Sequence, residues 1–258
     1  MIAPIHSKPS IDLWTVRFKP DPAARLRLFC CPAAGSGPAT FREWPAALPA
    51  QVEVCMVQLP GRERRLREAP YRQLSMLVED LGEALHPYLD LPFAFFGHSL
   101  GALISFELAR YLTREHALQP VHLFVAGRRA PHLLDPDSPL HQLPDSALVA
   151  EVQRRYEGIP EVIRQDDDLM QLFLPILRAD FAVIETYAYA NEDPLECSIT
   201  AYGGLQDSRT SLDSLSAWRD QTRGNFTMRL FPGGHFFVNS ARSLVLEAFA
   251  EELSALAK

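Results

Sequence analysis

The stretch that most constrains the fold spans residues 93–103 and reads FAFFGHSLGAL. Its short apolar run predicts a buried strand, GHSLG predicts a sharp turn, and the pattern that follows predicts a helix over 102–115. A G-x-S-x-G motif requires this strand, turn and helix, because the turn strains the serine backbone and exposes the hydroxyl above the sheet edge. Ser99 is therefore the candidate nucleophile, with an ordinary tight turn as the alternative.

The rest of the chain alternates between strand and helix patterns. Period-two or short apolar runs predict further strands at 14–18, 25–31, 52–59, 121–126, 198–202 and 226–231. Helical spacing predicts helices at 41–48, 74–85, 144–156, 166–189 (interrupted by Pro175), 212–222 and the C-terminus. Because crossovers between strands of one sheet are right-handed, this order favours an α/β fold with a mostly parallel central sheet flanked by helices.

One long segment breaks the alternation. Between the strands at 121–126 and 198–202 the pattern is mostly helical, which is typical of an insertion that covers a site at the carboxyl edge of a sheet. We therefore expect a core formed by 14–132 and 197–258, a helical lid at 133–196 and a flexible tail at 1–13. Phe173, Leu177 and Phe181 are candidate substrate-binding residues on the long lid helix, although they can equally pack on the body.

Two further polar residues follow strands and complete a candidate triad with Ser99. Asp207 lies in the loop after the 198–202 strand, and His235 lies in the loop after the 226–231 strand. The order of serine, acid and histidine is that of α/β-hydrolases, and loops at one sheet edge bring such residues together. Asp213 and, more weakly, Asp180 compete for the role of the acid. His98 is expected to pack rather than to react.

Two loops near the predicted site have less specific patterns. The small-residue loop at 32–38 follows a central strand and leaves backbone N–H groups free to face an anion. The loop at 60–67 holds four arginines and one glutamate. We interpret that run as a solvated surface, with contact to a phosphate or an acidic partner as the alternative.

Composition excludes several classes of function. The 258-residue chain has a net charge of −7, which gives no electrostatic case for binding nucleic acid. Its longest uncharged run, 91–106, is too short and too polar for a membrane span, so we expect no membrane association and a cytoplasmic protein. The four cysteines lack ligand spacing and are interpreted as small apolar residues, so no metal is expected: Cys30, Cys31, Cys55 and Cys197.

Taken together, the motifs resemble those of type II thioesterases, the free-standing editing enzymes of polyketide and nonribosomal peptide synthesis. The resemblance runs from about Trp14 to the C-terminus and rests on LFCCP (28–32), QLPGRE (58–63), GHSLG (97–101), GRRAP (127–131), LRADF (177–181), the stretch 203–207 and FPGGHFF (231–237). One departure is Ala33, where the family usually has a histidine.

This resemblance implies an α/β-hydrolase fold and thioester hydrolysis through an acyl-enzyme on Ser99. The backbone N–H groups of Leu100 and Ala34 are expected to bind the oxyanion. The implied partners are acyl or peptidyl carrier protein domains, whose phosphopantetheine arm belongs to the substrate, so no cofactor is expected. A monomer is expected. A small-molecule esterase or acyltransferase with the same triad, or a non-catalytic carrier-binding protein, are the alternatives.

Overall fold

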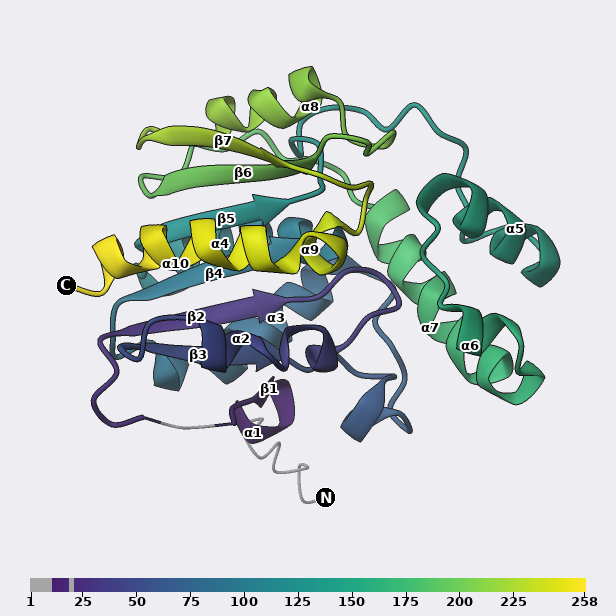
Figure 1. The fold of residues 1–258 in the computed structure, drawn as a ribbon, viewed down its shortest axis with the longest axis horizontal. Coiled ribbons are helices and arrows are strands. Elements are labelled where there is room, and N and C mark those ends of the chain that lie inside the picture. The colour runs from purple at the N-terminus through teal and green to yellow at the C-terminus, as the bar shows by residue number, and fades with distance from the viewer. Residues whose placement is uncertain (1–10, 19–20) are drawn as a thin grey trace, which may run out of the picture.

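The computed structural model describes residues 11–18 and 21–258, so residues 1–10 of the expected tail lie outside the described part. The described residues form a seven-stranded sheet with the order β1-β3-β2-β4-β5-β6-β7. Its strands are β1 (Thr15–Val16), β2 (Leu26–Cys31), β3 (Val52–Val57), β4 (Phe93–His98), β5 (His122–Ala126), β6 (Ser198–Gly204) and β7 (Phe226–Phe231). Only β1 is antiparallel to its neighbour, so β2 to β7 end at one edge of the sheet (Figure 1).

Helices cover both faces of the sheet, because the buried strands are apolar on both sides. On β4, Phe93 and Phe95 pack on one face with α3 (Leu74–Leu85) and α4 (Leu100–His116). Ala94 and Phe96 pack on the other face with α2 (Trp44–Ala47), α9 (Phe237–Ser240) and α10 (Arg242–Leu256). The result is the three-layer α/β architecture predicted from the alternation of the elements.

The segment between β5 and β6 forms three helices that lie beyond the carboxyl ends of the strands (Figure 1). They are α5 (Asp145–Tyr156), α6 (Glu161–Arg164) and α7 (Asp167–Glu185). This segment, called the insertion below, has its own apolar cluster of Leu140, Leu148, Val152, Ile159, Phe173, Leu177 and Phe181. Its helices therefore bury apolar side chains between one another, at the edge of the sheet where the candidate triad was predicted.

Several predicted elements differ from those observed. The strand expected at 14–18 is only Thr15–Val16, because the helix α1 (Ile11–Trp14) precedes it and Trp14 is buried beneath the guanidinium of Arg65. The helix expected at 41–48 is a 3₁₀ turn, η1 (Pro38–Phe41), followed by the short α2. The helix expected at 212–222 is α8 (Leu212–Ser216), continued by the 3₁₀ helix η4 (Ala217–Gln221).

The long helix of the insertion runs through Pro175 without interruption and ends at Glu185, not at residue 189. A proline inside a helix removes one hydrogen bond. Here the buried residues on both sides of it, Phe173, Ile176 and Leu177, hold the helix together by packing. Tertiary contacts thus override the local signal for a break.

Close contact between strands and α4 fixes the turn at Ser99. A Cβ at Gly101 would lie 2.0 Å from the carbonyl oxygen of Cys31 on β2, and one at Gly97 would lie 2.1 Å from the carbonyl oxygen of Gly101. Real Cβ atoms do not approach backbone this closely, so only glycine fits at either position. The two glycines of GHSLG therefore allow α4 to begin directly against β2.

This contact predicts that Gly101→Ala lowers the free energy of unfolding by about 3 kcal/mol or prevents folding, because backbone atoms must move apart to admit the methyl group. Gly234→Ala is the matched control, since the nearest heavy atom outside its neighbours lies 3.8 Å from the added Cβ. Its effect should stay within about 1 kcal/mol. Denaturant unfolding measures both, and equal stability of the two variants would contradict the packing argument.

Candidate active site

Ser99 lies at the turn between β4 and α4 with φ 54° and ψ −110°, a conformation that non-glycine residues rarely adopt. Its backbone N–H donates to the carbonyl of Ala126 at the end of β5, at 2.8 Å. The strained turn is thus held by a hydrogen bond to the neighbouring strand. The geometry is that of the predicted nucleophile turn, and it directs the hydroxyl into a pocket at the sheet edge.

The structure brings Ser99, His235 and Asp207 together in one hydrogen-bonded row. The Nε2 atom of His235 lies 2.9 Å from Ser99 Oγ, and its Nδ1 atom lies 3.0 Å from Asp207 Oδ2. Asp207 lies in the loop after β6 and His235 in the loop after β7, as expected. With these contacts the imidazole can accept the serine proton through Nε2 while the carboxylate holds Nδ1–H.

The carboxylate of Asp207 is kept ionised in this row. Burial acts to raise its pKa, but the hydrogen bond and charge of His235 and a hydrogen bond from the backbone N–H of Arg209, at 2.8 Å, outweigh burial and lower the pKa. The two competing acids do not contact His235. Asp213 is exposed on α8, and Asp180 is paired with Arg62 on another side of the site.

His98, in GHSLG, supports the histidine loop. Its Nε2 lies 2.8 Å from the carbonyl oxygen of His235, and because a carbonyl only accepts, Nε2 carries the proton. Burial lowers the pKa of His98 to about 3, with the neighbouring His235 ring adding to the shift, so the ring is neutral. His98 is therefore a packed, hydrogen-bonded support for His235, which refines the packing role expected from the sequence.

The small-residue loop after β2 faces Ser99. Ala33 and Ala34 line the same pocket as Ser99, and Leu100 is the first residue of α4, whose N–H has no acceptor within the helix. The two N–H groups expected to bind an oxyanion, those of Ala34 and Leu100, thus come from the two segments that meet at the nucleophile. Ala33, where the family usually has a histidine, offers only a methyl group to the pocket.

A buried ion pair holds this loop in place, and sequence reasoning missed it. Arg62 and Asp180 form a bidentate pair with both N···O distances 2.8 Å. The carboxylate also accepts the N–H of Gly35 at 2.8 Å, and the guanidinium donates to the carbonyl of Ser36 at 3.0 Å. The prediction that the arginine run at 60–67 is a solvated surface is therefore wrong for Arg62 and for Arg65, both of which are buried.

The three candidate lid residues divide into two groups. Leu177 and Phe181 of α7 line the pocket that contains Ser99 and His235. Phe173 does not line this pocket in the described structure; it is buried with its ring against Gly35 of the loop after β2. The helical spacing that grouped the three residues gave no signal for this difference.

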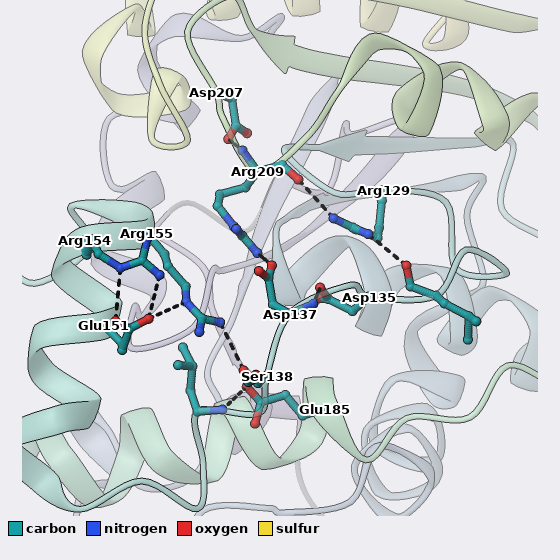
Figure 2. Close-up of polar contacts among 12 residues, drawn as sticks. Arg129, Asp135, Asp137, Ser138, Glu151, Arg154, Arg155, Glu185, Asp207 and Arg209 are labelled. Carbon is teal, nitrogen blue, oxygen red and sulfur yellow. Dashed lines mark hydrogen bonds and ion pairs between the residues drawn. The ribbon is translucent and has the colours of Figure 1, made fainter.

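Other residues of the pocket were not singled out from the sequence. The ring of Tyr156, the last residue of α5, lies 5.0 Å from the ring of His235 in an edge-to-face contact. Arg209, two residues after the acid of the row, forms an ion pair with Asp137, while Arg155 of α5 donates to the carbonyl of Ser138 at 3.1 Å (Figure 2). The part of the insertion that precedes α5 is thus connected both to the Asp207 loop and to α5 itself.

Two kinds of feature are absent from the described residues, 11–18 and 21–258. No helix there is long and apolar enough to cross a membrane. No group of three or more histidine, cysteine, aspartate or glutamate side chains there is arranged to hold a metal ion. All four cysteines are buried, in keeping with their interpretation as small apolar residues.

The chain is similar to several known proteins over nearly its whole length. A family model described as "Thioesterase domain" matches residues 26–256. The gramicidin S biosynthesis protein GrsT of Aneurinibacillus migulanus is 44% identical over 243 residues, covering 94% of each chain. The thioesterase RedJ of the prodiginine biosynthetic pathway in Streptomyces coelicolor is 38% identical with a TM-score of 0.84, covering 97% of this chain and 95% of RedJ. The type II thioesterase BorB of the borrelidin cluster is 34% identical with a TM-score of 0.85, covering 96% and 100%.

The Arg62–Asp180 pair predicts that Asp180→Asn lowers the free energy of unfolding by about 3 kcal/mol, because a buried guanidinium loses its counter-charge. The control is Asp145→Asn, which removes an exposed carboxylate that pairs with Arg178 and should cost less than about 1 kcal/mol. Urea unfolding of both variants measures the difference. Equal losses would mean that the buried pair contributes no more than a surface pair.

Proposed function

This chain belongs to the thioesterase family and hydrolyses thioesters, and on that premise we propose that it acts on acyl groups carried by the phosphopantetheine arm of carrier proteins. The observation that carries the mechanism is the row formed by Ser99, His235 and Asp207, with hydrogen bonds of 2.9 and 3.0 Å. The resemblance to type II thioesterases, drawn from the sequence motifs, is confirmed by the family match and by relatives such as BorB.

In the proposed reaction, His235 removes the proton of Ser99 as its oxygen attacks the thioester carbonyl. Asp207 holds the imidazole in the tautomer whose Nε2 can accept that proton, and it stabilises the imidazolium that forms. As the C–S bond breaks, His235 gives its proton to the departing thiolate sulfur, which leaves as a thiol, and the acyl group stays on Ser99 as an ester. Water, activated by the same imidazole, hydrolyses the ester and frees the acid.

The negative charge on the carbonyl oxygen in each tetrahedral intermediate is assigned to the N–H groups of Ala34 and Leu100. Such donors act most strongly when they are fixed before the reaction. The strained turn fixes Leu100, and the contacts of Gly35 and Ser36 with Asp180 and Arg62 fix the loop that carries Ala34.

Carrier proteins are the proposed partners because the relatives are named for secondary-metabolite assembly: GrsT for gramicidin S biosynthesis and BorB for the borrelidin cluster. On such assembly lines a free-standing thioesterase would remove misprimed or stalled acyl groups. The insertion at 133–196 is proposed as the lid, since its apolar side chains cover the pocket beside Ser99. The absence of a cofactor, a monomeric state and a cytoplasmic location stay predictions.

Hydrolysis through Ser99 predicts that Ser99→Ala abolishes turnover of an acyl-carrier substrate while the protein stays folded, because a buried hydroxyl is lost without a large cavity.

Asp207→Asn should slow turnover about ten-thousand-fold, the size of the effect when the corresponding carboxylate is replaced in a serine protease. Asp213→Asn is the matched control, since Asp213 is exposed on α8 and makes no hydrogen bond to His235 in the described structure. A large loss in that variant instead would contradict the choice of Asp207.

Comparison of acyl-carrier substrates with free esters, and of the wild-type protein with Ser99→Ala in the producing cell, separates the alternatives. An esterase or acyltransferase would cleave or transfer from free esters faster than from acyl-carrier thioesters. A non-catalytic carrier-binding protein would keep its biological effect after Ser99→Ala.

The pocket predicts that Leu177→Ala changes the preference between short and medium acyl chains, because Leu177 lines the pocket beside Ser99. Phe173→Ala is the control on the same helix, since Phe173 contacts the loop at Gly35 and should mainly lower stability. Melting temperatures and kcat/KM for acyl-carrier substrates of two chain lengths measure both effects. An unchanged preference together with a large stability loss in Leu177→Ala would make this residue ordinary core.

A further inference from the structure

Arg128 is a charged residue in the pocket that the proposed reaction leaves without a role. It follows Gly127 at the end of β5, and its half-buried side chain lines the same pocket as Ser99 and His235. Within residues 11–18 and 21–258, its guanidinium makes no hydrogen bond and no ion pair, and its Nε atom is enclosed without a partner. Its backbone is fixed, since its carbonyl accepts the indole N–H of Trp218 at 2.8 Å.

The neighbouring arginines of the pocket do have protein partners. Arg129 donates to the carbonyl of Leu134 at 2.9 Å, and Arg209 forms an ion pair with Asp137 (Figure 2). Asp135 lines the pocket as well, but it is exposed and forms no ion pair with Arg128. The pocket wall thus holds three arginines and one aspartate, in a chain whose net charge is −7.

A guanidinium nitrogen that is enclosed without an acceptor, as Nε of Arg128 is, is unfavourable. Buried polar groups in native proteins almost always have a partner, and leaving one unsatisfied costs stability, more so for a charged group. Burial lowers the pKa of Arg128, yet an arginine keeps its proton at neutral pH. A ligand oxygen that entered the pocket would supply the missing acceptor, and a carboxylate would match the planar donors best.

Tyr156 places a second donor in the same pocket. Its hydroxyl makes no hydrogen bond within the described residues, and its ring contacts that of His235. Burial raises the pKa of Tyr156 to about 12, although the positive charge of Arg128 acts in the opposite direction. The hydroxyl therefore keeps its proton and can donate beside the guanidinium.

The position of Arg128 favours the acyl chain over the phosphate of the arm as its ligand. A Cβ at Gly127 would lie 3.5 Å from Cε1 of His235, so the backbone that carries Arg128 passes beside the ring of the catalytic histidine. The phosphate of a phosphopantetheine arm lies roughly 15 Å or more from the thioester sulfur, counted along extended bonds. Arg128 lines the pocket together with Ser99, His235, Leu177 and Phe181, so its ligand is assigned to the acyl side of the thioester.

We propose that Arg128, together with the Tyr156 hydroxyl, binds a carboxylate or keto oxygen on the acyl chain, so that the enzyme prefers oxygenated acyl groups to saturated ones of similar length. The proposal rests on the acyl-enzyme at Ser99 described above. It divides the pocket into an apolar wall from α7 and a polar contact from Arg128. Together these two parts determine which acyl groups the enzyme prefers.

The test uses N-acetylcysteamine thioesters, which lack the phosphate, with succinyl, 3-oxobutanoyl and butanoyl groups. Arg128→Met should lower kcat/KM about tenfold to hundredfold for the first two and less than about threefold for butanoyl, because only the oxygenated chains lose a charge-assisted hydrogen bond. Tyr156→Phe should show the same selectivity with a smaller loss, and Arg128→Lys should restore part of the succinyl activity. Arg154→Met is the control, since Arg154 is exposed on α5 and pairs with Glu151.

Other results would overturn the proposal. An equal loss for all three substrates in folded Arg128→Met would mean a structural role, and no loss would mean that no acyl oxygen is bound. A loss seen only with phosphopantetheine-linked substrates would assign Arg128 to the phosphate. If the wild-type protein hydrolyses none of the three thioesters, nor the same acyl groups on carrier proteins, the proposed function fails and this inference fails with it.

Discussion

The contact of α4 with the end of β2 is the constraint on which the site depends. Gly97 and Gly101 leave no side chain between the turn and the strand, so the helix begins against the carbonyl of Cys31. That contact, with the hydrogen bond from Ser99 to Ala126, holds the serine in its strained conformation at the start of α4. Because β6 and β7 are parallel neighbours in the same sheet, their loops reach this point with Asp207 and His235.

Electrostatic contacts join the insertion to this framework at two places. The buried pair of Arg62 and Asp180 connects α7 to the loop after β3 and, through Gly35, to the loop that faces Ser99. The ion pair of Arg209 with Asp137 connects the Asp207 loop to the segment that precedes α5 (Figure 2). The same helices that cover the pocket therefore also position the groups that surround the nucleophile. The two ion pairs that hold the insertion over the pocket therefore also hold the loops beside Ser99 and Asp207.

Charge is distributed unevenly between the surface and the pocket. The chain as a whole is acidic, while the wall beside Ser99 is rich in arginine. Of those arginines, Arg209 is neutralised by a carboxylate, and Arg129 is hydrogen bonded to a carbonyl. Arg128 lines the same pocket, and among the three it is the one whose guanidinium makes no hydrogen bond or ion pair in the described structure, although the Nε atoms of both Arg128 and Arg209 are enclosed without a partner. A polar contact at this point complements the apolar side chains of α7.

The sequence by itself determined the fold class, the nucleophile turn and the three residues of the hydrogen-bonded row. These follow from local patterns: apolar periodicity marks each strand, and a polar residue just after a strand lies at the sheet edge wherever the sheet is parallel. Tertiary structure decided what local patterns do not encode. Arg62 is buried against Asp180, which lies 118 positions away in the sequence. The helix α7 continues through Pro175. Leu177 and Phe181 line the pocket, whereas Phe173 does not. These outcomes depend on contacts between residues that are far apart in the sequence. A charged side chain is buried only where an opposite charge meets it. A face of a helix lines a pocket only where the packing of the rest of the protein leaves space.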